Sequence, residues 1–362
     1  MSLAADLQDV VEAWWNDLTP AENRVVVFLA AFLFLLFAAW AVGYLQLAYL
    51  FYLLALAGMY LLLSLGLNVQ WGYTGLINFS VAAFFGIGAY GTALVTASNS
   101  PIAGGFSPLL GLVVGLAGAA VIAVLIGIPT LRLRADYLAI ASLGLAEVVR
   151  SVITNQVPWT NGSSGISGIP RFYANWPVVG DLTRPLPVSI LNLMLVSVFV
   201  AVVYLFLRRI HRSPWGRVQR TIRADEDLAE ALGKDTYRRK MQSFVIGSVI
   251  MALAGVFYAH LTLYLGPGDL DPIRTFYVWI AVILGGSGSN RGAMFGGFTI
   301  IAILEGTRFL NGIELIPFDI APLRLLAVGA LIILIIRFRP EGVLPPQDEL
   351  IWPDSLRGET DE

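Results

Sequence analysis

The chain of 362 residues contains no cysteine, only two histidines and only two lysines. Without cysteine it can form no disulfide, no thiolate metal site and no cysteine nucleophile. The histidines, His211 and His260, do not have the spacing of a metal site, so no metal ion is expected. No Gly-x4-Gly-Lys-Ser/Thr loop is present, so the chain is not expected to hydrolyse ATP by itself. No Ser-His-Asp arrangement is readable either, and an enzyme is not expected.

Charge is also scarce, because only 13% of the residues are charged while 57% are hydrophobic. Soluble domains carry about 25% charged residues, so a chain with so few has lipid as its main solvent. The apolar residues form blocks of about 18–22, the length that crosses a bilayer as a helix. The blocks lack the alternation of barrel strands. The formal net charge of −2 says little about partners, and no nucleic-acid partner is expected.

The blocks predict an all-α polytopic membrane protein with about ten transmembrane helices, some of them broken or re-entrant. Two blocks are unusual. Residues 137–153 carry Glu147 and Arg150, and residues 274–287 are few and end in adjacent glycines. The predicted spans are 25–42, 46–65, 76–97, 108–128, 137–153, 188–207, 242–263, 274–287, 292–310 and 319–337.

Arginine placement predicts the orientation, because loops on the cytoplasmic side are enriched in arginine and lysine. Arginines follow the fourth, sixth and tenth spans, which puts these exits and both termini in the cytoplasm. We therefore expect a cytoplasmic segment at 1–24, a transmembrane domain at 25–340 and a cytoplasmic tail at 341–362. An interfacial helix and a frayed terminus are both compatible with the segment at 1–24. The first segment does not resemble a cleaved signal peptide, because it lacks an early basic region. Residues 154–187 are expected outside the cytoplasm.

The longest cytoplasmic segment, 208–241, is dense in charge. Within it, residues 224–232 contain no glycine or proline and have helical spacing, and Gly233 is well placed to end a helix. The sequence predicts a short exposed helix followed by a tight turn. A docking element for a cytoplasmic partner and a solvated charged loop remain equally compatible with this pattern.

Polar side chains also gather after the second span, beside glycines that can interrupt a helix. Irregular backbone at membrane depth is tolerated where it lines a cavity or is buried in protein, so this segment is the first candidate for a transport path. The glycine-rich entry at 72–75 has a possible counterpart at 285–288, as in duplicated transporter halves. The path candidates are Asn68, Gln70, Tyr73, Asn78 and Ser80.

Two acid–base pairs lie within predicted spans at a spacing of three residues, Glu147 with Arg150 and Glu305 with Arg308. Residues three apart share a helix face. A self-neutralising pair is the favoured interpretation, and a pair facing a water-filled path is the alternative.

Four blocks of this sequence together resemble the branched-chain amino acid ABC transporter permeases of the LivH/LivM class, most of all the LivM type. The first is 66–80, Gly-Leu-Asn-Val-Gln-Trp-Gly-Tyr-Thr-Gly-Leu-Ile-Asn-Phe-Ser, continuing through 83–90. The second is 131–140 with the Glu-Val-Val-Arg that ends at Arg150. The third is 160–170, Thr-Asn-Gly-Ser-Ser-Gly-Ile-Ser-Gly-Ile-Pro. The fourth comprises 216–233, 255–260 and 284–289.

The resemblance implies the ABC importer permease fold in the cell membrane of a prokaryote. It implies a second permease subunit in a heterodimer, two cytoplasmic ATP-binding subunits that hold ATP and magnesium, and an extracytoplasmic solute-binding protein. This chain would hold no cofactor. The segment Glu-Ala-Leu-Gly at 230–233 looks like the motif that couples a permease to its ATPases. The coupling candidates are Arg217, Arg220, Arg223, Asp225, Glu226, Glu230, Ala231 and Gly233.

The implied cargo is a branched-chain or other hydrophobic amino acid, although residues 78–81 depart from the pattern of relatives. Urea, short amides or a sugar are alternative cargoes of the same superfamily. An ATP-independent secondary transporter is a further alternative, against which the charged 208–241 segment and the absence of an isolated intramembrane acid both argue.

Overall fold

The computed structural model describes residues 20–41, 43, 45–174, 176, 184–310 and 321–346. The predicted interfacial segment before residue 20, the tail beyond residue 346 and part of the 154–187 segment lie outside these ranges. The side chain of Arg308 is also outside the description.

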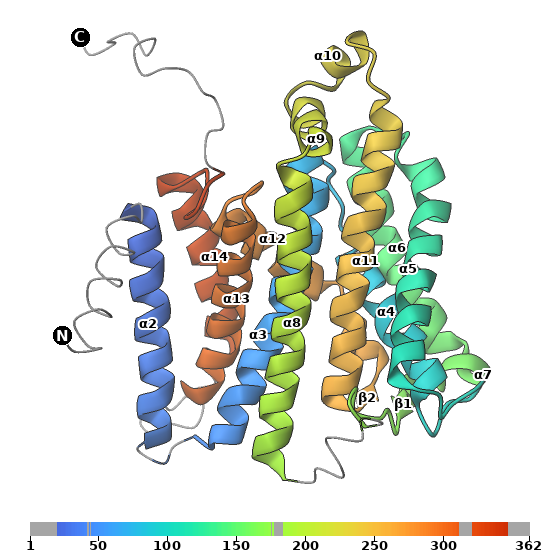
Figure 1. Ribbon diagram of the computed structural model, residues 1–362, viewed down its shortest axis with the longest axis vertical. Helices are drawn as coiled ribbons and strands as arrows, with labels where there is room; N and C mark the ends of the chain where they lie inside the picture. The colour runs from blue at the N-terminus through green and yellow to red at the C-terminus, as the bar shows by residue number, and fades with distance from the viewer. Residues whose placement is uncertain are drawn as a thin grey trace, which may run out of the picture.

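The chain forms a helical bundle (Figure 1). Each of the ten predicted spans overlaps one of its longer helices. These helices are α2 (Pro20–Ala41), α3 (Leu47–Leu67), α4 (Val81–Thr96), α5 (Pro108–Thr130), α6 (Ala135–Asn155), α8 (Pro185–His211), α11 (Thr236–Thr262), α12 (Ile273–Gly285), α13 (Asn290–Leu310) and α14 (Ala321–Phe338). The smaller elements are the π-helix η1 (Asn68–Gly72), α7 (Val157–Thr160), η2 (Gly162–Ser164), β1 (Ile166–Ser167), α9 (Pro214–Ala224), α10 (Glu226–Ala231), β2 (Tyr264–Leu265) and η3 (Pro267–Leu270).

Six helices within the described residues are long and apolar enough to cross a membrane: α2, α3 with η1, α5, α6, α8 and α11. Several shorter apolar helices accompany them, including α4 and α12. The chain is therefore a multi-pass membrane protein, and the count of ten stays a prediction. In α3 and α11, 72% of the apolar window is buried, against 22–28% in α5, α6 and α8. The first two form the centre of the bundle, and the other three present apolar side chains outward, as lipid-facing helices do.

The two ends of the bundle differ. One end carries α9 and α10, and the other carries the two-stranded β1–β2 pair (Figure 1). We call them the α10 end and the β end. The helices α5, α8 and α14 all finish at the α10 end, and α2 begins there (Figure 1). The arginine-rich exits therefore share one end of the molecule, as the sequence predicts.

Two helices run only half the length of the bundle. The continuous helix from α3 through η1 reaches the α10 end, the chain returns as extended backbone over 75–80, and α4 then covers only the remaining half. In the opposite sense, α11 runs to the β end, residues 263–272 return inward, and α12 covers only the half towards the α10 end. These two helix–return–half-helix units are inverted copies of one arrangement, which is frequent in transporters.

This arrangement corrects three expectations. The span expected at 76–97 is helical only from Val81, because the preceding backbone is extended. The 137–153 segment is part of α6, which has no break. The glycine-rich entry at 72–75 has its structural counterpart in the return at 263–272 and not at 285–288, because it is α11 and α12 that repeat the path of α3 and α4.

Small residues allow α4 and α11 to pack closely. A Cβ at Gly88 would lie 2.1 Å from the Ala252 carbonyl oxygen, and one at Gly255 would lie 1.9 Å from that of Phe85. Close approach through glycine is a common way for helices to associate in a membrane. It fixes α4 against the half of α11 nearest the β end, so that the beginning of α4 lies half-way along the bundle.

Candidate functional site

The amide side chains of the predicted path form a cluster where η1 meets the α12–α13 loop. Asn68 donates through Nδ2 to Asn290 Oδ1 at 3.1 Å and accepts from the Gly288 N–H at 2.7 Å. The Tyr73 hydroxyl donates to the same Asn290 oxygen at 2.5 Å. Both Asn68 and Tyr73 are fully buried. The π-helix η1 follows α3 directly, with Asn68 as its first residue and Tyr73 as its C-cap.

A second group of contacts joins η1 to α11. Gln70 donates through Nε2 to the Phe244 carbonyl at 2.8 Å and to Ser248 Oγ at 3.2 Å. Its Oε1 accepts from Asn78 Nδ2 at 2.6 Å, and Asn78 Oδ1 accepts from the Ser80 N–H at 2.8 Å. All five path candidates are thus buried and hydrogen-bonded inside the chain. We call them, with Asn290, the amide cluster.

The structure brings the path candidates together. A groove of about 900 Å³ lies between α2, α3, α8 and α13, and none of the five path candidates lines it. Whether they contact cargo stays a prediction, and in this conformation they hold η1, α4, α11 and α13 together.

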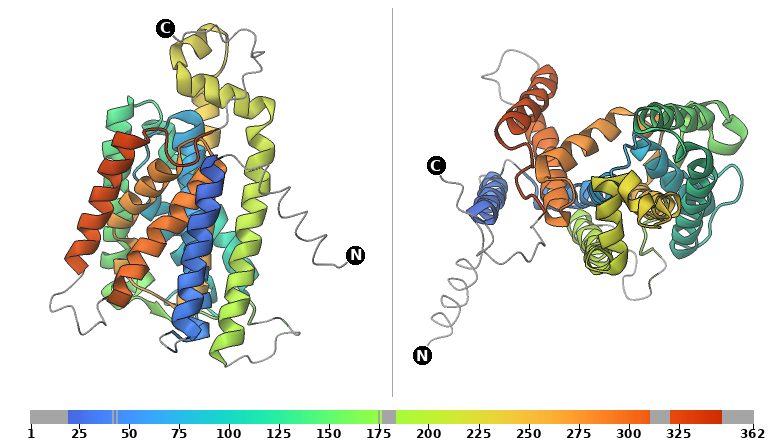
Figure 2. Two further views of the ribbon diagram at one scale, coloured as in Figure 1. Left: turned by 90° about the vertical axis from the view of Figure 1, so that its left-hand side faces the viewer. Right: turned by 90° about the horizontal axis from the view of Figure 1, so that it is seen from above.

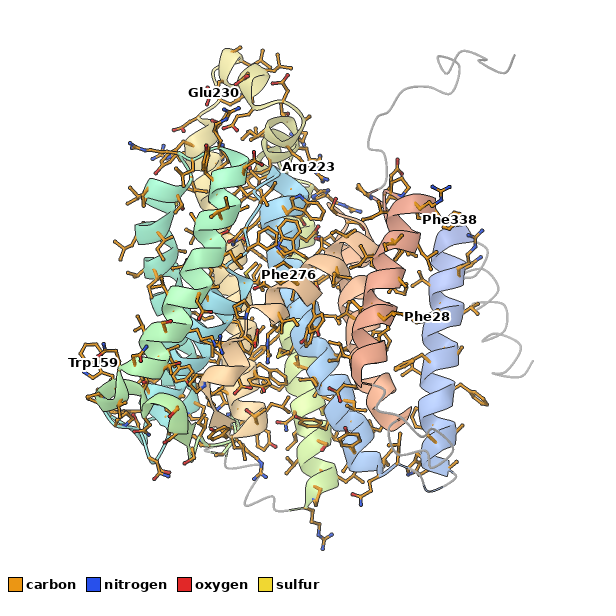
Figure 3. The ribbon with its side chains drawn as sticks, turned by 180° about the vertical axis from the view of Figure 1, so that it is seen from behind. Phe28, Trp159, Arg223, Glu230, Phe276 and Phe338 are labelled. Atoms are coloured by element: carbon orange, nitrogen blue, oxygen red, sulfur yellow. The ribbon has the colours of Figure 1, made fainter. Side chains whose placement is uncertain are left out.

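The two half-helices begin side by side. Thr275 Oγ1 accepts from the Ala82 N–H at 3.0 Å, and Trp279 Nε1 donates to the Asn78 carbonyl at 3.0 Å. Phe79 stacks on Trp279 with ring centroids 4.8 Å apart. Phe276, in the first turn of α12, lies at mid-height in Figure 3. The positive ends of two helix dipoles therefore meet half-way along the bundle.

Arg274, which belongs to none of the sequence motifs described above, lies at this meeting point. Its Nη1 is 3.9 Å from the sulfur of Met59, the middle residue of the continuous helix Leu47–Gly72. Its guanidinium lies over the rings of Phe85 and Tyr258, with centroids 4.6 and 5.1 Å away. A single basic residue at the edge of the 274–287 block was the available signal, but without the half-helix geometry it reads as an interfacial residue.

At the α10 end, Arg223 of α9 connects three segments. It donates to the Gly72 carbonyl at the end of η1 and, through Nη2, to Ser287 Oγ in the α12–α13 loop at 2.8 Å. Burial lowers the pKa of this guanidinium. Although its side chain is exposed in part, Arg223 is bonded to two other segments and is not a free surface charge.

The short helix expected at 224–232 exists as α10, and Figure 3 shows Glu230 there at the tip of the molecule. Asp225 separates α10 from α9 and caps it, since its carboxylate accepts from the Leu228 N–H at 2.9 Å. Gly233 adopts φ +75° and donates to the Glu230 carbonyl at 2.8 Å, while the Lys234 N–H bonds the Ala229 carbonyl at 3.0 Å. This pair of bonds is a Schellman motif and confirms the predicted turn.

Several charges proposed for docking have partners inside the chain. Glu226 forms an ion pair with Lys240, and Glu230 accepts from the Thr236 hydroxyl at 2.5 Å. Arg220 lies 3.0 Å from His211 Nε2. Arg217 and Ala231 are exposed.

Two leucines are the outward apolar residues of α10 and its C-cap. Leu228 is 52% and Leu232 63% exposed. Residues four apart share a helix face, and both leucines lie on the outside of the tip.

The predicted pair of Glu147 and Arg150 forms, with Oε2 and Nη1 3.5 Å apart, on the exposed surface of α6. In the second predicted pair, Glu305 lines a small apolar cavity with Ala57 and Phe298.

At the β end, the 160–170 block is tied to the return segment that leads to α12. Ile166 pairs with Leu265 in the β1–β2 ladder, and Tyr264 donates to the Ser164 carbonyl at 3.1 Å. His260 Nδ1 lies 2.7 Å from the Pro170 carbonyl. Movement of this block would therefore pull on the return segment.

Comparisons with known proteins agree with this architecture. The family model "Branched-chain amino acid transport system / permease component" matches residues 49–336. The high-affinity branched-chain amino acid transport system permease protein LivM of Escherichia coli (strain K12) is 31% identical over 306 residues, 79% of this chain and 68% of that protein.

A second LivM protein and a LivH protein give similar matches. A probable branched-chain amino acid transport permease protein LivM of Methanocaldococcus jannaschii is 28% identical over 341 residues, 82% of this chain and 93% of that protein. The permease protein LivH of Salmonella typhimurium is 28% identical over 263 residues, 69% of this chain and 82% of that protein. No solved structure matches the chain.

These relatives are transport permeases and components of multi-subunit transport systems, which confirms the interpretation of this chain as a transport subunit and not an enzyme. The matched region runs from α3 into α14 and includes both half-helices, η1 and α10. The chain belongs to the family of branched-chain amino acid transport system permease components.

Proposed function

We propose that this chain is one of two permease subunits of an ATP-driven, binding-protein-dependent importer of branched-chain or other hydrophobic amino acids. The α10 end faces the cytoplasm of a prokaryotic cell, and both termini lie on that side. The arginines that follow α5, α8 and α14 support this orientation, since all three exits share the α10 end.

The observation that carries the proposal is the α10 tip. It is a short, doubly capped helix that projects from the bundle and exposes two leucines (Figures 1 and 3). A pair of exposed leucines on a rigid projection of a membrane protein suits insertion into an apolar groove of a partner. We assign that groove to an ATPase subunit, which binds ATP and magnesium.

Arg223 transmits movement of the tip. It contacts η1 and the α12–α13 loop together, so displacement of α9 acts on the ends of α3 and α12 at once. At the β end the 160–170 block receives the solute-binding protein, and its contacts to β2 lead to α12 from the other side. The second permease, related to this one, completes a heterodimer.

The docking step is tested with the double variant Leu228→Asp, Leu232→Asp in the complete complex expressed with its partners. The substitutions replace two leucines that would be buried in the groove with charged side chains that are costly to bury there. The amount of ATPase that co-purifies should therefore fall by at least about tenfold. The control is Leu133→Asp, an exposed leucine in the α5–α6 loop. Retention of the ATPases by the double variant, at the level of the control, would overturn the assignment of α10.

A further inference from the structure

Arg274 occupies an unusual position for a cation. It begins a half-helix half-way along a membrane-embedded bundle, with Met59 at the centre of α3 as a neighbour. A charged side chain at such depth is costly and is normally paired or functional. Among the described residues, no carboxylate lies within ion-pair distance of Arg274, whereas Glu147 and Glu226 both have cationic partners.

The surroundings of Arg274 hold a cation without neutralising it. The rings of Phe85 and Tyr258 offer their faces to the guanidinium, which also reaches the Met59 sulfur and the Tyr258 hydroxyl. Cation–π contacts favour the charged form while leaving most of the five N–H donors available to an oxyanion. Arg274 and Tyr258 are both only partly buried, so they remain accessible.

A carboxylate stands close to this cradle. The Tyr258 hydroxyl donates to Asp269 Oδ1 at 2.7 Å, and Asp269 Oδ2 accepts from the Gly266 N–H at 2.9 Å. A single tyrosine therefore lies between a guanidinium and a carboxylate that do not bond each other. The guanidinium and the carboxylate are complementary in charge to the carboxylate and ammonium groups of a free amino acid.

We propose that Arg274 binds the carboxylate of an amino-acid zwitterion in transit and that Asp269, across Tyr258, binds its ammonium group. The α-carboxylate of the cargo would be the anionic partner of Arg274, for which the described residues supply no carboxylate. The positive dipole ends of α4 and α12 add to the potential that attracts it. An apolar side chain of the cargo then lies against the aromatic rings. The site rests on the proposed function and adds to it the part of the cargo that the permease recognises.

The test uses the complete complex in proteoliposomes with leucine-loaded binding protein. Leucine uptake and ATP hydrolysis are measured on the same preparation. Arg274→Gln should lower uptake per ATP hydrolysed by about 10- to 100-fold, because a charge-assisted bidentate contact is lost. ATP hydrolysis stimulated by the binding protein should persist, since both docking ends are intact. Arg274→Lys keeps the positive charge but loses the planar, forked N–H donors of the guanidinium, so its uptake per ATP hydrolysed should be intermediate.

Arg134→Gln is the matched control, because Arg134 is an exposed arginine at the beginning of α6. Wild-type uptake per ATP in either Arg274 variant would overturn the proposal, and the lysine variant decides the matter if the glutamine variant does not assemble. Absence of ATP-dependent leucine uptake by the unaltered complex would instead reject the proposed function, which is a separate outcome.

Discussion

The amide cluster and the surroundings of Arg274 differ in whether their polar groups have partners of complementary charge or hydrogen bonding inside the chain. In the amide cluster, Asn68, Gln70 and Asn78 have hydrogen-bond partners inside the chain. At the start of α12, a full positive charge has aromatic faces and no carboxylate partner among the described residues. Satisfied polar networks rigidify a fold, whereas an uncompensated ion at membrane depth requires another source of compensation. In our proposal, this difference distinguishes the residues that hold the transporter together from the residue that binds cargo.

The variant Gln70→Leu tests most strongly whether the amide cluster has a structural role and not a role in cargo contact. The substitution removes the donor to Phe244 and Ser248 and the acceptor for Asn78. Leaving buried groups unpaired costs about 1–3 kcal/mol each, so we expect a clear fall in the melting temperature of the purified complex. Uptake per assembled complex should remain within about twofold of wild type, because the cluster is not assigned to cargo contact.

Gln156→Leu is the matched control for this prediction, since Gln156 is exposed in the α6–α7 connection. Its melting temperature should stay close to that of the wild type. If Gln70→Leu keeps its stability and loses uptake, the amide cluster lines the path after all, as the sequence first suggested.

A loss of uptake without a loss of docking is expected at Arg223, which joins the end of η1 to the α12–α13 loop. Arg223→Met removes the donors to Gly72 and Ser287 while keeping a long side chain. Hydrogen bonds to charged groups contribute about 1.5–3 kcal/mol, and here their loss weakens transmission and not docking. ATPase co-purification should be unchanged, and leucine uptake per ATP should fall by about 3- to 10-fold.

Arg212→Met, which alters an exposed arginine at the end of α8, provides the comparison. Equal uptake per ATP in the two variants would show that Arg223 is an ordinary structural arginine.

Much of the fold could be predicted because its signals are local. Apolar runs of membrane length gave the helices, and arginines after three of them gave the shared end. Gly233 marked the end of α10, because a left-handed C′ residue is a local requirement. The extended return at 75–80 was harder to place, since it is stabilised by contacts such as Phe79 N–H with Ser142 Oγ at 2.8 Å, 63 positions away.

The functional residues were less predictable for the same reason. Charges in the 208–241 segment suggested docking, yet Arg223 bonds Ser287, 64 positions away, and Glu226 pairs with Lys240 of the same segment. In our proposal, the exposed leucines form the docking face instead. Arg274 was missed because its depth follows from α12 being a half-helix, which only the path of residues 263–272 reveals.

The most direct measurement is the thiol labelling of single cysteines introduced into this chain, which has none of its own. Single cysteines are introduced as Asp271→Cys, one turn before Arg274, and as Gln70→Cys in the amide cluster, with Val198→Cys on the outer face of α8 as the lipid-facing control. Complexes with cysteine-free partners are exposed to a membrane-impermeant thiol reagent during ATP turnover. We predict labelling at 271, slowed when the binding protein carries leucine, and no labelling at 70 or 198. Labelling at 70 that leucine slows, with position 271 unreactive or indifferent to leucine, would contradict the assignment of the cargo path to the start of α12.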